Sequence, residues 1–162
     1  MIQATARVLK NLIEIQVGSE TWTGRPIESG QSGLARRIAA LFSTEYVTYR
    51  PSAPAEVHST VTYVRKSDEI RVQIGEEHWK THETEYGPMS IEYGGVQYLI
   101  LERLTGRFAI LRENRPVAKG QLGFRSCAIR DYPAELEMFL ANLALGYLIR
   151  TLTWEAFGWG GT

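Results

Sequence analysis

The stretch Met138-Phe-Leu-Ala-Asn-Leu-Ala-Leu-Gly-Tyr-Leu-Ile149 decides the expected fold, because it is apolar on nearly every face of a helix. It lies within residues 133–152, where Pro133 suits the first helical position and Glu135 and Glu137 favour the positive end of the helix dipole. A helix without a broad polar side must be surrounded by other parts of the protein. The uncharged run is also shorter than the roughly 20 residues that cross a bilayer. The sequence therefore predicts a buried core helix.

The segments before this helix read as short strands joined by turns. Leu12 to Val17 alternates apolar and polar residues, as a half-buried strand does. Gly94 and Gly95 separate two apolar runs and predict a type I′ hairpin turn, which needs positive φ at both positions. A second turn is expected at residues 112–116. The other expected strands are residues 45–49, 57–65, 70–74, 89–93, 96–101, 108–111, 117–122 and 126–129.

Successive hairpins predict an antiparallel meander, so the fold class is mostly β with a buried C-terminal helix (α+β). The expected architecture is an antiparallel β-barrel, or a strongly curved sheet, that encloses the hydrophobic helix. Turns are expected at residues 24–26 and 29–33, and a short amphipathic helix at 34–42. No linker, repeat or low-complexity tract divides the chain, so residues 1–162 are expected to form one domain.

Composition narrows the class of protein. Eighteen basic residues balance 18 acidic ones, which disfavours a nucleic-acid binder. Cys127 is the only cysteine, so no internal disulfide forms and reducing surroundings are favoured. The N-terminus lacks the pattern of a secretory signal, and the expected location is cytoplasmic.

Asn142 is the one strongly polar side chain in the apolar run, and we expect it to bond to a strand backbone or to line an opening of the barrel.

The order Gly106-Arg-Phe-Ala-Ile-Leu-Arg-Glu-Asn-Arg-Pro-Val-Ala-Lys-Gly-Gln-Leu122, then Cys127-Ala-Ile-Arg-Asp131, then the apolar helix, resembles the closing third of the tubby C-terminal-like superfamily. This group includes the tubby proteins, the plant LURP-one-related proteins and the phospholipid scramblases, in which a β-barrel encloses a hydrophobic C-terminal helix. The resemblance covers residues 86–152. The expected helix at 34–42 has no place in the family's pattern, and the C-terminal residues 154–162 differ from the tubby signature. The resemblance implies an architecture and no subfamily.

The resemblance also implies a candidate function. Tubby domains bind phosphoinositide head groups on a basic face, so the candidate is a non-catalytic binding module for anionic lipid or phosphoinositide, peripheral at a membrane. The matching residues are Arg103, Arg107, Arg112, Arg115, Lys119 and Arg125, where several guanidinium groups can meet one phosphate. The plain alternative is a solvated outer face. Neither the calcium-binding acidic segment nor the palmitoylated cysteine cluster of scramblases is present in the sequence, so lipid scrambling is not expected.

Other patterns lead to different function classes. His78 and His82 have the spacing of a metal pair on a helix face or on one side of a strand, which gives a metal-dependent enzyme as a further alternative function. The other interpretation is two exposed histidines in an acidic loop. Ser126 and Cys127 are possible nucleophiles, but a packed thiol is the favoured interpretation. No nucleotide-binding or hydrolase motif occurs, so no cofactor is expected and a non-catalytic protein is favoured. A protein-interaction scaffold that uses the acidic residues within 68–92 remains the second hypothesis.

Overall fold

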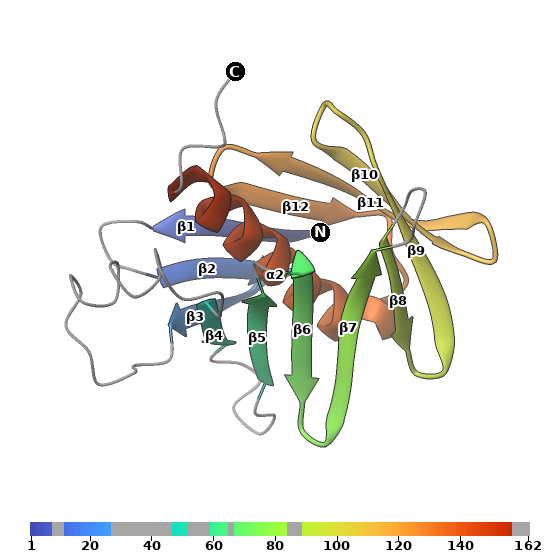
Figure 1. Cartoon of the computed structure of the whole chain (residues 1–162), viewed down its shortest axis with the longest axis horizontal. Coiled ribbons are helices and arrows are strands. Elements are labelled where there is room, and N and C mark those ends of the chain that lie inside the picture. The colour runs from blue at the N-terminus through green and yellow to red at the C-terminus, as the bar shows by residue number, and fades with distance from the viewer. Residues whose placement is uncertain (8–11, 27–46, 52–58, 65–66, 84–88, 157–162) are drawn as a thin grey trace.

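The computed structural model describes residues 1–7, 12–26, 47–51, 59–64, 67–83 and 89–156 (Figure 1). Its strands pair antiparallel in sequence order, and β1 also pairs with β12, which closes the ring of pairings into a barrel. The bounds of the strands are β1 Ile2–Arg7, β2 Leu12–Val17, β3 Glu20–Pro26, β4 Val47–Pro51, β5 Ser59–Val64, β6 Glu69–Ile74, β7 Glu77–Glu83, β8 Met89–Tyr93, β9 Val96–Glu102, β10 Arg107–Arg112, β11 Arg115–Gly123 and β12 Ser126–Arg130.

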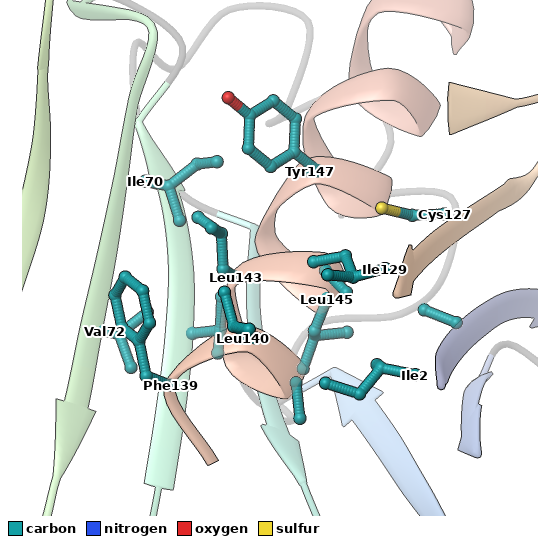
Figure 2. Close-up of a cluster of buried hydrophobic side chains, with 14 of the residues drawn as sticks. Ile2, Ile70, Val72, Cys127, Ile129, Phe139, Leu140, Leu143, Leu145 and Tyr147 are labelled. Carbon is teal, nitrogen blue, oxygen red and sulfur yellow. The ribbon is translucent and has the colours of Figure 1, made fainter. Parts of the chain in front are cut away.

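The C-terminal helix fills this barrel, as the sequence predicted. A 3-10 turn, η3 (Ala134–Leu136), leads into α2 (Glu137–Ala156), which therefore ends beyond the expected residue 152. Phe139, Leu143 and Tyr147 have no exposed surface. The helix contacts β1, β6 and β12, and Figure 2 shows Phe139 and Leu143 on the side of Ile70 and Val72, with Leu145 on the side of Ile2 and Ile129. Close-packed apolar side chains all round the helix explain why its sequence has no polar face.

All nine expected strands are present, and several of their ends shift by one or two residues. The turn at Gly94 and Gly95 is confirmed, since φ is +58° and +72° at these positions. The turn expected at residues 112–116 is shorter, because only Glu113 and Asn114 form it and β11 begins at Arg115. The expected helix at 34–42 and the turn at 29–33 lie outside the described residues.

The turn predicted at residues 24–26 is wrong, because these residues belong to β3. Gly24 pairs with Ile13 of β2 and lies against the central helix. A Cβ atom at Gly24 would stand 3.2 Å from Leu145 Cδ1. The glycine therefore marks a close approach of strand and helix, which a sequence pattern does not distinguish from a turn.

Aromatic rings and an ion-pair network close the two ends of the core. At the N-terminal end of α2, the Phe139 ring packs against Trp79, Tyr93 and Tyr98 at centroid distances of 4.8, 4.6 and 5.5 Å. At the C-terminal end, Arg150 binds Asp68 through two bonds of 2.8 and 2.6 Å. Burial acts to lower the pKa of this guanidinium, but the bonds and charge of Asp68 raise it above its ordinary value.

Asn142 was expected to bond to a strand backbone or to line an opening of the barrel, but it is only 1% exposed and bonds within its own helix. Its Nδ2 donates to the Met138 carbonyl oxygen on its own helix, at 2.9 Å, rather than to a strand. Its Oδ1 is buried without a partner among the described residues. A short amide at this position reaches the carbonyl one turn earlier, so the helix itself satisfies the donor.

Candidate functional site

The barrel separates the six basic residues singled out from the sequence into groups. All six are exposed. Arg112 and Arg115 flank the turn between β10 and β11, at one end of these strands. Arg107 begins β10, and the rise of a strand places it about 17 Å from Arg112. Lys119 lies in the middle of β11, and its Nζ is 3.5 Å from the Asp131 carboxylate. The six residues therefore do not surround one phosphate together.

Arg103, Arg107 and Arg125 share one end of the barrel, where the β9–β10 and β11–β12 turns lie side by side. The Arg103 backbone nitrogen donates to the Arg107 carbonyl oxygen at 2.8 Å, which closes the first turn. The Leu122 nitrogen donates to the Gly106 carbonyl oxygen at 2.7 Å, which joins this turn to β11 next to the second turn. Both turns are thus fixed to the rim of the barrel.

Gly106 allows this junction to form. Its φ is +74°, and a Cβ atom there would stand 2.8 Å from the Leu122 carbonyl oxygen. Only glycine combines positive φ with such a close backbone contact. The β9–β10 turn is therefore held in a defined position next to β11.

Each of these two turns exposes a large apolar side chain. Leu104 is 109% exposed and Phe124 is 76% exposed, whereas most large apolar side chains of the described residues are buried or half-buried. The Arg125 guanidinium lies 4.7 Å from the centre of the Phe124 ring, a cation–π contact. We call the surface formed by Arg103, Leu104, Arg107, Phe124 and Arg125 the tip surface. Leu104 and Phe124 were not predicted from the sequence, although an apolar residue inside a polar turn was the available signal.

The tip surface carries positive charge that the described residues leave uncompensated. No described carboxylate forms an ion pair with Arg103, Arg107 or Arg125. Glu102 precedes Arg103 in the chain, but its carboxylate lies 3.3 Å from Arg150 Nη1. An anion that approaches the tip surface therefore meets three arginines and two exposed apolar groups.

His78 and His82 do not form a metal site. They lie on β7 rather than in an acidic loop, and both are exposed on its outer side. Residues four apart on a strand are separated by about 13 Å, so one metal ion cannot bind both. Within the described ranges, no group of three or more His, Cys, Asp or Glu residues is placed to hold a metal ion. The hypothesis allowed a metal pair on a helix face or on one side of a strand, and the separation along β7 contradicts the second arrangement as the strand itself contradicts the first.

The acidic stretch 68–92 is partly neutralised by its own surroundings. Asp68 binds Arg150, and Glu69 forms ion pairs with Arg71 and Lys80. These carboxylates stabilise the barrel and are less available to a basic partner. Glu76, Glu77 and Glu92 remain exposed on the neighbouring strands and turn.

Cys127 is a packed thiol, as the sequence favoured. It lies in β12, has no exposed surface and contacts the central helix (Figure 2). Burial raises the pKa of the Cys127 thiol to about 12, and the Glu102 charge adds to this effect. A thiol that stays protonated and covered is a poor nucleophile.

We therefore expect Cys127 to resist alkylation in the folded protein. Iodoacetamide at pH 8 should leave the native chain unmodified for hours, because neither the thiolate nor access to it is available. The same reagent should modify Cys127 fully in denaturant, which serves as the control. Mass spectrometry reads both results, and rapid native alkylation would contradict the burial of β12 against α2.

No family model matches this chain, and no curated protein or solved structure matches it either. Among the described residues, no helix combines the length and the apolar character that a membrane crossing requires. The function is therefore inferred from the chemistry of the surface itself.

Proposed function

We propose that the protein is a non-catalytic module that binds anionic membrane surfaces through the tip surface. The observation that carries this proposal is the pairing of Leu104 and Phe124, exposed on adjacent turns, with three arginines that lack described ion-pair partners. Apolar side chains on fixed turns enter the boundary between head groups and acyl chains, while nearby guanidinium groups bind phosphate. The resemblance to the tubby C-terminal-like superfamily, and a cytoplasmic location, stay predictions from the sequence.

The free energies that the arginines and the apolar side chains can contribute favour reversible attachment to the membrane, and this attachment needs both. A basic residue near an anionic surface contributes about 1 kcal/mol, so three arginines supply about 3 kcal/mol. Burying a Leu or Phe side chain fully contributes about 1.5–3 kcal/mol, and partial entry contributes less. Neither term alone gives stable anchoring, as with other peripheral proteins that use two signals. Attraction by the arginines weakens with salt because it decays within a Debye length of about 10 Å at 0.1 M.

Charge reversal at the tip surface should abolish this binding. The double substitution Arg103→Glu and Arg107→Glu changes the charge by four units, which corresponds to about 4 kcal/mol and a loss of affinity of at least about 100-fold, measured at about 0.1 M salt. Co-sedimentation with vesicles containing phosphatidylserine measures the change. Both positions are exposed turn or strand-end residues, so thermal stability should change little.

The opposite end of β10, where Arg112 and Arg115 lie, provides a matched control. Arg112→Glu with Arg115→Glu makes the same change in net charge about 17 Å away along β10, beyond the Debye length. This variant should bind with less than a threefold loss. Equal losses in the two variants would show that net charge acts rather than the tip surface, and would contradict the proposal.

The apolar term is tested separately. Leu104→Ser with Phe124→Ser keeps the charge and removes the apolar contacts, so binding should fall about tenfold or more and the residual binding should vanish at high salt. Vesicles of equal surface charge, with phosphatidylserine or a phosphoinositide, distinguish general anionic attraction from head-group recognition. Full binding by the double serine variant would refute insertion of these turns.

A further inference from the structure

The outer face of β9 and β10 is apolar. Ile100 and Ile110 point into the barrel and have no exposed surface, so the residues on either side of them along each strand point outward. These outward residues form two cross-strand pairs, which we call the outer patch: Leu99 with Leu111, and Leu101 with Ala109. Leu101 is 41% exposed, whereas Leu99 and Leu111 are half-buried and are not among the described side chains that pack on the core.

Other walls of the barrel have a polar outer face. On β1, β6 and β7 every residue that alternates with the buried ones is polar: Gln3, Thr5, Arg7, Glu69, Arg71, Gln73, His78, Lys80 and His82. Figure 1 shows β9 and β10 on the side of the barrel away from β2 and β3. The outer patch is therefore a local departure from the polar outer surface of this barrel.

The outer patch continues into the tip surface. Arg103 and Arg107 lie opposite each other, since the Arg103 nitrogen donates to the Arg107 carbonyl oxygen at 2.8 Å. They are two residues away from Leu101 and Ala109 along their strands, so they share the outward face and lie about 7 Å further along it. Beyond them, the turn exposes Leu104. One apolar band thus runs from the turn down the outside of β9 and β10, with two arginines across it.

The charges around the outer patch are unequal at its two ends. The end at the tip surface has arginines without a described ion-pair partner. At one side of the patch, Lys119 of β11 pairs with Ala109, and the Asp131 carboxylate lies 3.5 Å from its Nζ. The far end carries two acids and two arginines, and therefore no net charge: Glu92, Glu113, Arg112 and Arg115. An anionic surface is attracted to the tip end and gains little from the far end.

The size and charge of the outer patch favour a bilayer over a second protein chain. Two strands about 4.8 Å apart and two rows about 7 Å apart give an area on the order of 100 Å². A stable protein interface buries about 800 Å² on each partner. Two copies stacked through this face would also bring both sets of arginines together, which like charge opposes. A bilayer offers phosphate groups beside acyl chains, which matches arginines beside leucines.

We propose that the protein docks on an anionic bilayer at an incline, with the tip surface deepest and the outer patch turned toward the lipid head groups. This inference rests on the membrane proposal and adds the wall of the barrel that faces the lipid. Arg103 and Arg107 lie at the level of the phosphates, and Leu101 buries its remaining exposed surface. The far end of the patch is lifted from the membrane, so the depth of the side chains falls from Leu104 to Leu101 to Leu99.

A matched pair of labels distinguishes this orientation from end-on docking. Leu101 lies two residues before Arg103, at the base of the β9–β10 turn. Ala128 occupies the equivalent outward position on β12, two residues after Ser126, which pairs with Gly123 at the base of the β11–β12 turn. In end-on docking the two positions lie at similar distances from the lipid. In the inclined orientation only Leu101 faces it.

The polarity-sensitive fluorophore is attached to Leu101→Cys, Ala128→Cys or Leu104→Cys in the full chain, where the buried Cys127 does not react. On addition of phosphatidylserine vesicles, emission at 104 and 101 should shift to the blue and be quenched by spin-labelled lipid, more strongly at 104. Emission at 128 should stay unchanged. Quenching at 104 with equal quenching at 101 and 128, or with none at 101, would overturn the inclined orientation and leave the membrane proposal standing. No response at 104 would overturn both.

A substitution tests the same face without a label. Leu101→Ser should weaken co-sedimentation with these vesicles about three- to eightfold, because less than half of a leucine side chain remains to be buried there. Ala128→Ser is the matched control and should change binding less than about twofold. Thermal midpoints close to the wild type show that both variants are folded. Sedimentation velocity without vesicles tests the alternative, since a dimer that Leu101→Ser dissociates would make the outer patch a protein interface and overturn the inference.

Discussion

Replacing Leu143 by Asp is expected to leave no folded protein at 25 °C. Leu143 has no exposed surface and lies at the middle of the helix that fills the barrel (Figure 2). Losing a buried leucine side chain costs about 2–5 kcal/mol, and an unpaired carboxylate in the same place adds several more. A domain of this kind is stable by only about 5–15 kcal/mol. Circular dichroism and the soluble fraction after expression measure the result.

Leu143→Met is the matched control for this prediction. A volume-conserving apolar exchange costs less than about 1.5 kcal/mol, so this variant should fold and melt a few degrees below the wild type. If the Asp variant is soluble and melts with the methionine variant, the helix is not enclosed by the sheet.

The substitution Gly146→Leu is expected to cause the second large loss of stability. A Cβ atom at Gly146 would stand 2.4 Å from Ile70 Cγ2 and 3.3 Å from Val61 Cγ1. Glycine inside a helix costs about 1 kcal/mol relative to alanine, so the close contact with β5 and β6 gives a reason for it. Overpacking costs about 1–3 kcal/mol and exceeds this range when no space exists. We expect a loss of at least 3 kcal/mol, which lowers Tm by about 6–12 °C.

A second-site change separates steric overlap from other causes. Gly146→Ala should be destabilised mainly by the Cγ2 methyl of Ile70, so Ile70→Ala, which removes this methyl, should cost less stability in the Gly146→Ala chain than in the wild type. Thermal melts of the single and double variants give the coupling. A Gly146→Leu protein as stable as the wild type would mean that the helix does not pack on β5 and β6 at this point.

Much of the fold was predictable because burial leaves a strong pattern in the sequence. The run from Met138 to Ile149 has no polar face, and only enclosure satisfies such a helix. Strands with alternating residues, such as β2, and the glycine pair at Gly94 and Gly95 were found for similar local reasons. These signals depend on neighbouring residues alone.

Three strands, β1, β3 and β7, were not predicted from the sequence. Each has few large apolar side chains on the face that points into the barrel. In β7 only Trp79 is a large apolar residue, and buried Thr81 occupies the next inward position. In β1 two of the inward positions are Ile2 and Ala4. In β3 the large inward residue is Trp22. Closure of the barrel onto the helix buries these strands, which local propensity does not record.

The candidate site was predictable only in part. The sequence placed arginines on turns, but the pairing register decides which turns share an end of the barrel, and it separates Arg107 from Arg112. Leu104 and Phe124 read as single surface apolar residues until the structure brings their turns together.

The most direct test of the tip surface places a polarity-sensitive fluorophore on one turn. Cys127 is buried, so a label on Leu104→Cys is specific in the folded chain, and Arg115→Cys provides the matched site at the other end. On addition of phosphatidylserine vesicles, emission at position 104 should shift to the blue and be quenched by spin-labelled lipid, while emission at 115 stays unchanged. Equal changes at both positions, or none at 104, would contradict insertion of the tip surface.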